Sequence, residues 1–451
     1  MPKLPPKSTG GFRFLGVAAD PAAMNELHLG QRTIFGAEEP FGIGLEDTRR
    51  HIYVIGQTGT GKTTLLRNLL LQHIHAGHGV ALIDPHGDLA ADLLANYPPW
   101  RADDLVCFNP ADAEFPIGFN PLANVPVAQR PLVTAGLVSA FKSIWKDSWG
   151  PRLEYILANT IAALLEAQNT SLLGVNRMLS DESYRAWVVR QIKDPFLRKF
   201  WEEEFANYDP RFMREATAPI QNKLGQLLLS PLLRNVLGQV RSKVNLRFMM
   251  DNKRVFIANL AKGKLGAEPS NLLGALLVAQ FQHAAMTRAD LTEDERRDFY
   301  LHIDEFQNFT TDGFAAALAE ARKYRLNLTL AHQYLEQLPR ETLAAVFGNV
   351  GTIISFRVGH TDAQVLAGEF GQSFVAENFS DLDRFEVLTR IPNGGITREP
   401  FRGKSHPPAY ARTMRAQKLI KRSREKYATQ RKSVESKLNR WLNQMRITPK
   451  I

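Results

Sequence analysis

The segment from Gly56 to Thr63 has the residue types and spacing of a phosphate-binding loop. It matches G-x-x-x-x-G-K-[ST], a pattern in which glycines let successive backbone N–H groups turn inward around a phosphate. We expect Lys62 to reach the β- and γ-phosphates of a nucleotide, and the hydroxyl of Thr63 to bind Mg²⁺. The residues predicted to line the phosphates are Gly56, Thr58, Gly59, Thr60, Gly61, Lys62, Thr63 and Thr64.

Two carboxylates and an amide provide side chains suited to hydrolysis. Asp304 and Glu305 follow the apolar stretch "FYLHI", and Gln333 follows the apolar stretch "LNLTLAH". We expect Asp304 to hold Mg²⁺, and Glu305 to orient or deprotonate the attacking water. The amide of Gln333 is predicted to contact the γ-phosphate or this water, and its alternative role is that of a polar residue at the start of a helix. Together with the loop, these residues predict the hydrolysis of ATP.

Two arginines are expected at a distance from the loop. Arg50 precedes the strand that leads into the loop, by about five residues at ~3.3 Å each. Arg322 ends the helix that follows Asp304. Neither side chain can easily reach a nucleotide on its own chain, so a catalytic role would place both as arginine fingers across a subunit boundary. A surface or DNA-facing charge is the alternative for each.

The surrounding apolar stretches predict an α/β sheet. Strand-length runs occur at His51 to Ile55 and Phe299 to Ile303, and within "GVALIDPHGDL", "DDLVCFNPADAEFPIGFNPL", "RVFIANL", "LNLTLAHQ" and "GTIISFRV", with helical spacing between many of them. Ligand sites in such sheets lie beyond the carboxyl ends of the strands. The loop, the acid pair and Gln333 are therefore expected at one edge of the sheet.

The chain divides by composition into five parts. Between Pro126 and Met250 the sequence changes to apolar residues at three- and four-residue spacing, as in "LEYILANTIAALLEAQ", which predicts helices. We therefore expect an N-terminal segment at 1–50, a P-loop NTPase domain in two parts at 51–125 and 251–402, an inserted all-helical domain at 126–250, and a basic helical tail at 403–451.

The positive charge of the chain is concentrated in this tail. From Arg402 to the end there are 15 Lys and Arg against Glu425 and Glu435, a balance of +13, so residues 1–401 sum to −3 of the total of +10. Such asymmetry indicates a polyanion partner, since phosphate backbones bind Lys and Arg through the release of counterions. The alternative for the tail is a solvated basic helix or a membrane-surface segment.

The tail also carries an apolar stripe. Ile420, Tyr427, Val434 and Trp441 recur at seven-residue intervals, which predicts a basic amphipathic helix within residues 410–445. Two roles stay open for this helix. It contacts DNA, or it packs on a neighbouring subunit or a partner protein.

The cysteine content and the length of the apolar stretches indicate the cellular compartment. A single cysteine, Cys107, excludes an intramolecular disulfide and fits a reducing compartment. The longest apolar stretches are well short of the ~18 residues that a membrane span requires. We expect a soluble cytoplasmic protein, or one recruited peripherally to the inner membrane.

Several motifs together resemble the HerA/FtsK superfamily and, within it, the ATPases of type IV secretion known as conjugative coupling proteins. The motifs are "IGQTGTGKTTLL", "DPHGDL", "FNPADAEFPIGFNPL", "SPLLRNVLGQ", "ANLAKGKLG", "YLHIDEFQNF", "EARKYRLNLTLAHQY" and "FRVGHTDAQVLAGEF". The resemblance implies a RecA-like fold and a hexameric ring with ATP between subunits, DNA through its centre, and a secretion or relaxase-type protein partner. Its motif positions fall on Lys62, Thr63, Asp304, Glu305 and Gln333, with Arg50 and Arg322 as finger or sensor positions.

The sequence thus predicts an ATP hydrolase that uses ATP and Mg²⁺ and works as a ring motor translocating DNA. Two alternatives are an ATPase that drives protein secretion or pilus assembly, and an ATP-dependent switch that translocates nothing. Salt-sensitive DNA binding would separate the first alternative from the favoured function, and turnover with and without DNA would separate the second.

Overall fold

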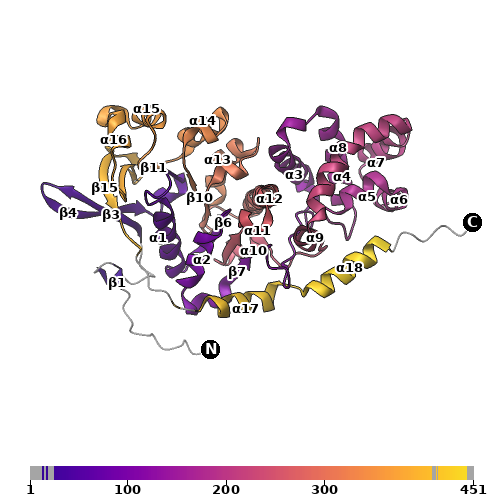
Figure 1. Ribbon diagram of the computed structural model, residues 1–451, viewed down its shortest axis with the longest axis horizontal. Helices are drawn as coiled ribbons and strands as arrows, with labels where there is room; N and C mark the ends of the chain where they lie inside the picture. The colour runs from indigo at the N-terminus through magenta and orange to yellow at the C-terminus, as the bar shows by residue number, and fades with distance from the viewer. Residues whose placement is uncertain (1–12, 15–16, 19–24, 409–412, 414, 444–451) are drawn as a thin grey trace, which may run out of the picture.

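An eleven-stranded sheet forms the centre of the computed structural model, which describes residues 13–14, 17–18, 25–408, 413 and 415–443 (Figure 1). Its spatial order is β4-β3-β15-β12-β11-β5-β10-β9-β6-β8-β7. The strands are β3 (Glu26–Ile34), β4 (Ala37–Gly44), β5 (Ile52–Ile55), β6 (Gly79–Asp84), β7 (Leu105–Phe108), β8 (Val255–Asn259), β9 (Phe299–Ile303), β10 (Leu326–His332), β11 (Thr352–Ser355), β12 (Glu386–Arg390) and β15 (Phe401–Ser405). Two-residue strands form two further small pairs, β1 (Arg13–Phe14) with β2 (Val17–Ala18) and β13 (Pro392–Asn393) with β14 (Ile396–Thr397).

The strands from β11 to β7 in this order run parallel, and β12, β15, β3 and β4 continue the sheet in antiparallel pairing. In the centre, β10 lies between β5 and β9, with Leu330 opposite Tyr53 on one side and Ile303 on the other. The carboxyl ends of these three strands therefore meet at one edge. The predicted α/β class is confirmed, because each run that the sequence singled out forms a strand.

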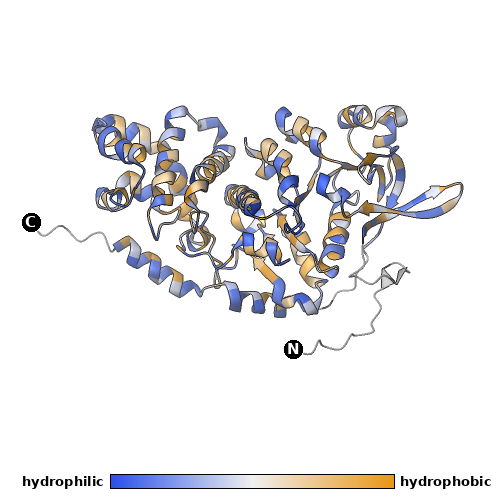
Figure 2. Cartoon of the chain, turned by 180° about the vertical axis from the view of Figure 1, so that it is seen from behind, coloured by the Kyte–Doolittle hydropathy of each residue, from blue (hydrophilic) through white to orange (hydrophobic). Residues whose placement is uncertain are grey.

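Alternate residues of each central strand bury on opposite faces of the sheet, as the two-residue period of a strand requires. In β5, Tyr53 and Ile55 join one hydrophobic cluster, whereas Ile52 and Val54 join the other. The helices α1 (Lys62–His75) and α2 (Asp88–Ala95) pack in the second cluster, and α12 (Ala267–Met286) packs in the first. Figure 2 shows hydrophobic residues gathered in the central strands.

Residues 126–250 form helices between β7 and β8, which the sequence predicted. They are α3 (Arg130–Ile144), α4 (Pro151–Glu166), α5 (Gly174–Ser180), α6 (Glu182–Val189), α7 (Pro195–Lys199), α8 (Pro210–Leu229), α9 (Pro231–Leu237) and α10 (Leu246–Asp251). We call this part the helical region. Its core is continuous with the cluster on one face of the sheet, where α12 packs against α3.

The remaining helices connect the later strands or follow the last one. They are α11 (Lys262–Leu265), α13 (Phe314–Ala321), α14 (Arg340–Asn349), α15 (His360–Glu369), α16 (Ala376–Ser380), α17 (Ala416–Tyr427) and α18 (Arg431–Asn443). No helix among the described residues has the length and apolar character needed to cross a bilayer. The expected N-terminal segment supplies β3 and β4 to the sheet, and β3 pairs with β15 at the start of the expected tail.

The expected single helix of the tail is wrong, because the chain forms two helices with a break between them. At the break, Ala428 pairs with Ile117 in an antiparallel bridge, and the N–H of Thr429 donates to the carbonyl of Pro116 over 3.1 Å. These backbone contacts replace helical ones. We call residues 416–443 the C-terminal strap, which runs beneath both the sheet and the helical region (Figure 1, yellow).

The apolar stripe of the strap packs on its own chain. Leu419 is buried, and Ile420 packs with it in the cluster that contains α1 and α2. Val434 is buried in the cluster shared with the helical region, and Trp441 packs at its border. There Arg177 of α5 donates to the carbonyl of Trp441 over 2.8 Å, and its guanidinium lies 4.7 Å from the centre of the indole ring.

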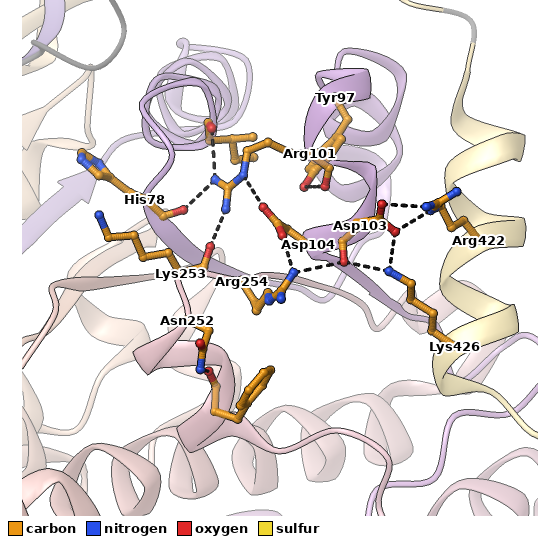
Figure 3. A network of polar contacts seen from close by, with 12 residues as sticks. His78, Tyr97, Arg101, Asp103, Asp104, Asn252, Lys253, Arg254, Arg422 and Lys426 are labelled. Carbon is orange, nitrogen blue, oxygen red and sulfur yellow. Dashed lines mark hydrogen bonds and ion pairs between the residues drawn. The ribbon is translucent and has the colours of Figure 1, made fainter. Parts of the chain in front are cut away.

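A polar network ties the strap to the sheet domain (Figure 3). Arg422 and Lys426 of α17 both donate to the carboxylate of Asp103, with shortest distances of 2.6 and 2.5 Å. These two cations lower the pKa of Asp103. The neighbouring Asp104 accepts from the buried Arg101 over 3.0 Å. Arg101 also donates to backbone carbonyls of Ile74, His78 and Lys253.

Candidate active site

The carboxyl ends of β5, β9 and β10 bring the predicted loop, acid pair and amide together. The segment Gly56–Gly61 follows β5, Asp304 and Glu305 follow β9, and Gln333 follows β10. Ile55 and His332 are opposite each other in register, so the loop and Gln333 leave the sheet side by side. The parallel register places the residues that the sequence predicted for the nucleotide around one edge, as in other open α/β sheets.

The loop has a backbone that only glycines fit. Gly59 and Gly61 have φ angles of +81° and +131°, which L side chains rarely adopt. A Cβ on Gly61 would lie 2.8 Å from the ring of Phe356 and 2.9 Å from that of Phe385. The N–H of Phe385 also donates to the carbonyl of Thr60 over 2.8 Å, which holds the loop against the sheet. These contacts and the two glycine φ angles hold the loop in this conformation.

Lys62 lies buried at the first turn of α1. Its Nζ donates to the carbonyl oxygens of Gly56 and Gln57, the second over 3.2 Å. Burial lowers the pKa of Lys62, while the nearby Glu305 and Asp304 raise it. The ammonium group is therefore held inside the loop, close to the acid pair. Among the other predicted contacts, Thr60 is buried and donates to the Gln57 carbonyl, Gly61 and Thr64 are half-buried, and Thr58, Gly59 and Thr63 are exposed.

Asp304 is a buried carboxyl group among other acids. Burial and the charges of Asp84 and Glu305 together raise its pKa to about 7, and Lys62 opposes them. Its own Oδ1 accepts only the N–H of Glu305 among the described residues, over 3.1 Å. A divalent cation would relieve this accumulation of negative charge, since carboxylate oxygens suit Mg²⁺. The donor set thus fits the metal that the sequence predicted.

Glu305 and Gln333 are joined to the loop by a chain of hydrogen bonds. The Nε2 of Gln333 donates to Glu305 Oε1 over 2.8 Å, and Thr58 Oγ1 donates to Gln333 Oε1 over 3.1 Å. Gln307 donates to the second carboxylate oxygen of Glu305 over 2.7 Å. Glu305 has a φ of +47°, a strained conformation for a non-glycine residue that is frequent at functional sites. Gln333 therefore bridges the nucleotide loop and the expected catalytic acid.

The structure adds one residue that the sequence analysis did not select. Lys262, at the start of α11, follows β8, and its Nζ donates to Asn308 Oδ1 over 2.7 Å. Burial lowers the pKa of Lys262 and the charge of Glu305 raises it. The signal was present in the sequence, because the carboxyl end of β8 shares the edge that carries the other predicted residues.

Arg50 and Arg322 lie at the opposite edge, as the strand direction predicts. They line a hollow of about 410 Å³ beyond the amino end of β5, together with His51, Leu318, Ala319, Gly348, Asn349, Val350, Gly351, Arg390 and Pro392. The Nη1 of Arg50 donates to the Gly395 carbonyl over 2.7 Å, whereas Arg322 is exposed. The structure does not bring these two arginines to the loop of the same chain.

The raised pKa of Asp304 predicts how stability depends on pH. The folded carboxyl titrates at about 7 and an unfolded one at about 3.9, so folding takes up a proton between these values and stability falls as pH rises through them. Asp304→Asn removes this penalty. Without nucleotide and with a chelator, we expect the variant to exceed wild type in stability at pH 8, on the order of 1–3 kcal/mol, and the two to converge near pH 4. Thermal melts at several pH values measure this, and identical pH profiles would contradict the burial argument.

Residues 37–379 match a family model described as the type IV secretion-system coupling protein DNA-binding domain. No curated protein sequence matches the chain. Solved structures with the same fold include the plasmid coupling protein TrwB with the GTP analogue GDPNP, at 15% identity and a TM-score of 0.61, covering 83% of this chain and 90% of that one. TrwB with ADP and Mg²⁺ is 16% identical and has a TM-score of 0.60, and the match covers 86% of this chain and 92% of that one.

A second protein whose solved structure has this fold is VirB4 of Thermoanaerobacter pseudethanolicus. It is 15% identical, has a TM-score of 0.51, and the match covers 84% of this chain and 95% of that one. At such identities these likenesses establish the fold, and the family model, which spans most of the chain, establishes the family.

Proposed function

The chain belongs to the family of type IV secretion-system coupling proteins, and from this premise we propose that it hydrolyses ATP to move DNA. It is a P-loop ATPase of the conjugative and type IV secretion kind. The observation that carries the proposal is the bridge from Thr58 through Gln333 to Glu305. This bridge links the loop that would hold the phosphates to the acid that would act on water.

The hydrogen bonds of this bridge and of Lys62 support a separate role in catalysis for each of Glu305, Gln333 and Lys62. Glu305 is the residue that accepts the proton of the attacking water, because its carboxylate faces the loop through Gln333. Gln333 positions Glu305 and responds to whatever occupies the loop, since both of its amide atoms are engaged. Lys62 leaves the Gly56 and Gln57 carbonyls to bind phosphate oxygens, which replace them as partners.

Thr63 and Asp304 would hold Mg²⁺, which would supply positive charge to neutralise the charge that develops on the phosphates. The solved structure of TrwB with ADP and Mg²⁺ supports the same cofactors here. Asp304 contributes a carboxylate whose pKa is raised by burial and by the charges of Asp84 and Glu305, so a bound divalent cation would stabilise its ionised form. Thr63 is exposed at the first turn of α1 and available as a ligand.

A ring of subunits supports the roles proposed for Arg50 and Arg322. Both lie beyond the amino end of β5, whereas the loop follows its carboxyl end. A cyclic arrangement apposes the opposite edges of two neighbouring chains, so that the arginines of one subunit reach the phosphates held by the next. We propose six subunits in this ring, with DNA in its centre.

The test is ATP turnover of the full chain with and without DNA. We expect duplex or single-stranded DNA to increase turnover severalfold at low salt, and the increase to vanish as salt weakens DNA binding. Lys62→Ala serves as the inactive control. Turnover that DNA leaves unchanged, together with no DNA binding at 50 mM salt, would refute DNA transport and leave the protein-secretion or pilus-assembly ATPase as the function to test.

A further inference from the structure

We propose that the outward face of the C-terminal strap binds the phosphate backbone of DNA, at a surface separate from the ATP site. The proposal rests on the proposed function only in taking DNA as the polyanion. The inward face of the strap is occupied by the chain itself, through Leu419, Val434 and the Trp441 carbonyl. The basic side chains left on the outside therefore need a different explanation.

The strap carries far more positive charge than its own chain neutralises. Residues 415–443, which are the strap and the residue before it, hold ten Lys and Arg and two Glu, a balance of +8. Three acids outside the strap pair with it, namely Asp103, Asp112 and Glu114. Subtracting these three leaves +5. Within the described residues, the cations with no ion-pair partner are Arg415, Lys418, Lys421, Lys432, Lys437 and Arg440.

These six side chains are exposed and follow the strap along its whole length. Lys418 and Lys421 lie on α17, and Lys432, Lys437 and Arg440 on α18. With 12 and 13 residues, the two helices together extend over roughly 35–40 Å, at ~1.5 Å per residue. Figure 2 shows hydrophilic residues along the strap over this length. A linear row of cations matches the linear charge of a nucleic acid.

The positive surface continues beside α18. Lys437 lines a hollow of about 430 Å³ together with Arg241 and Lys243, which are exposed on the connection between α9 and α10. Lys243 donates to the Ala428 carbonyl over 2.7 Å, so this connection is fixed to the break of the strap. The row of cations therefore widens to a surface at its centre.

The outward face of the strap suits a phosphate backbone better than it suits a membrane or a protein surface. A basic helix that enters a bilayer uses its apolar face, and here that face is buried in the chain. Protein interfaces centre on aromatic and large apolar residues, whereas Leu442 is the one exposed large apolar residue on the described part of the strap. Dispersed Lys and Arg side chains on a rigid support suit phosphate contacts, which position DNA without reading its sequence.

The experiment measures DNA affinity of the full chain against salt. The test variant carries Lys418→Gln, Lys421→Gln, Lys432→Gln and Lys437→Gln. With a 30-base-pair duplex, we expect affinity at 50 mM salt to fall at least tenfold. The slope of log affinity against log salt should decrease by about 0.9 for each phosphate that the variant can no longer neutralise. Basal ATP turnover without DNA should stay at the wild-type level, because none of the four residues lies near the ATP site.

A matched control removes the same charge elsewhere. It carries Lys146→Gln, Arg190→Gln, Lys193→Gln and Arg214→Gln, four exposed cations of the helical region. We expect this control to keep the wild-type slope. An equal fall in affinity in both variants would reduce the effect to net charge and overturn the proposal.

The single cysteine verifies that the strap stays docked in the test variant. The N–H of Cys107 in β7 donates to Ser423 Oγ of α17 over 2.8 Å, and burial raises the pKa of the Cys107 thiol to about 12. Its reaction with a thiol reagent should be as slow in the variant as in wild type.

If DNA binding is unchanged in the variant while DNA still stimulates ATP turnover, the proposal that the strap binds DNA is refuted and the proposed function stands. If vesicles containing phosphatidylserine bind to wild type and DNA does not, both DNA proposals fail.

Discussion

Replacing Glu305 by glutamine is expected to lower ATP hydrolysis by about 10³-fold, within the range that general acid–base catalysis contributes, while ATP stays bound. Glutamine keeps the shape of the side chain and one acceptor oxygen, so one of the two amide donors, Gln333 or Gln307, retains its partner. It cannot accept the proton of water. Single-turnover hydrolysis and equilibrium binding of ATP measure the two effects separately.

Lys62→Ala should show the opposite pattern. Lys62 is buried inside the loop and is expected to bind the phosphates of the ground state, so its removal abolishes tight ATP binding. Glu341→Gln, at an exposed glutamate on α14, is the control for Glu305→Gln, because it also removes one negative charge. Equal ATP affinity in wild type and Lys62→Ala would contradict the assignment of the loop. Undiminished turnover in Glu305→Gln would contradict the assignment of the base.

The second large effect concerns Arg322. We expect Arg322→Ala to reduce hydrolysis by ~10³-fold or more, the magnitude typical of an arginine finger, with nucleotide affinity nearly intact. The reason is its place at the edge opposite the loop, so that only a nucleotide on a neighbouring subunit would be within its reach. Arg50→Ala should act in the same direction but more weakly, because Arg50 is already engaged with the Gly395 carbonyl. Lys323→Ala, the adjacent exposed cation, is the control.

Mixed rings test whether Arg322 acts across the boundary. A subunit with Arg322→Ala keeps Glu305 intact, and a subunit with Glu305→Gln keeps its arginine. Where Arg322 of a Glu305→Gln subunit reaches the ATP site of an Arg322→Ala subunit, that site has both Glu305 and an arginine and is complete. Mixtures of the two variants should therefore turn over ATP faster than either alone, and mixtures no faster than the parents would show that Arg322 does not act in trans.

Strand positions and the residues after them were predictable because a parallel strand ends at a fixed edge. The apolar run Phe299–Ile303 determines where Asp304 begins, and the β5 run determines where the loop begins. Periodicity also revealed the helices of residues 126–250. These are local patterns, and the sequence displays them directly.

The contacts between distant segments could not be predicted. The seven-residue spacing of Ile420, Tyr427, Val434 and Trp441 is compatible with any apolar surface, and nothing in it distinguishes the sheet domain and helical region of the same chain from another subunit. The break at Ala428 depends on backbone pairing with Ile117, which lies far away in the sequence. Lys262 was missed because the motif "ANLAKGKLG", which contains it, does not by itself show that the end of β8 adjoins the acid pair.

The strap has a consequence for the solubility of the chain during synthesis. The strand β7 is last in the order of the sheet, so one side of it has no strand partner. Such an edge offers backbone groups to any other extended chain, and proteins cover it to prevent aggregation. Here α17 lies over β7, and Ser423 takes up the N–H of Cys107. Because the strap is translated after every strand of the sheet, the edge of β7 stays open to other nascent chains until the last helices have left the ribosome.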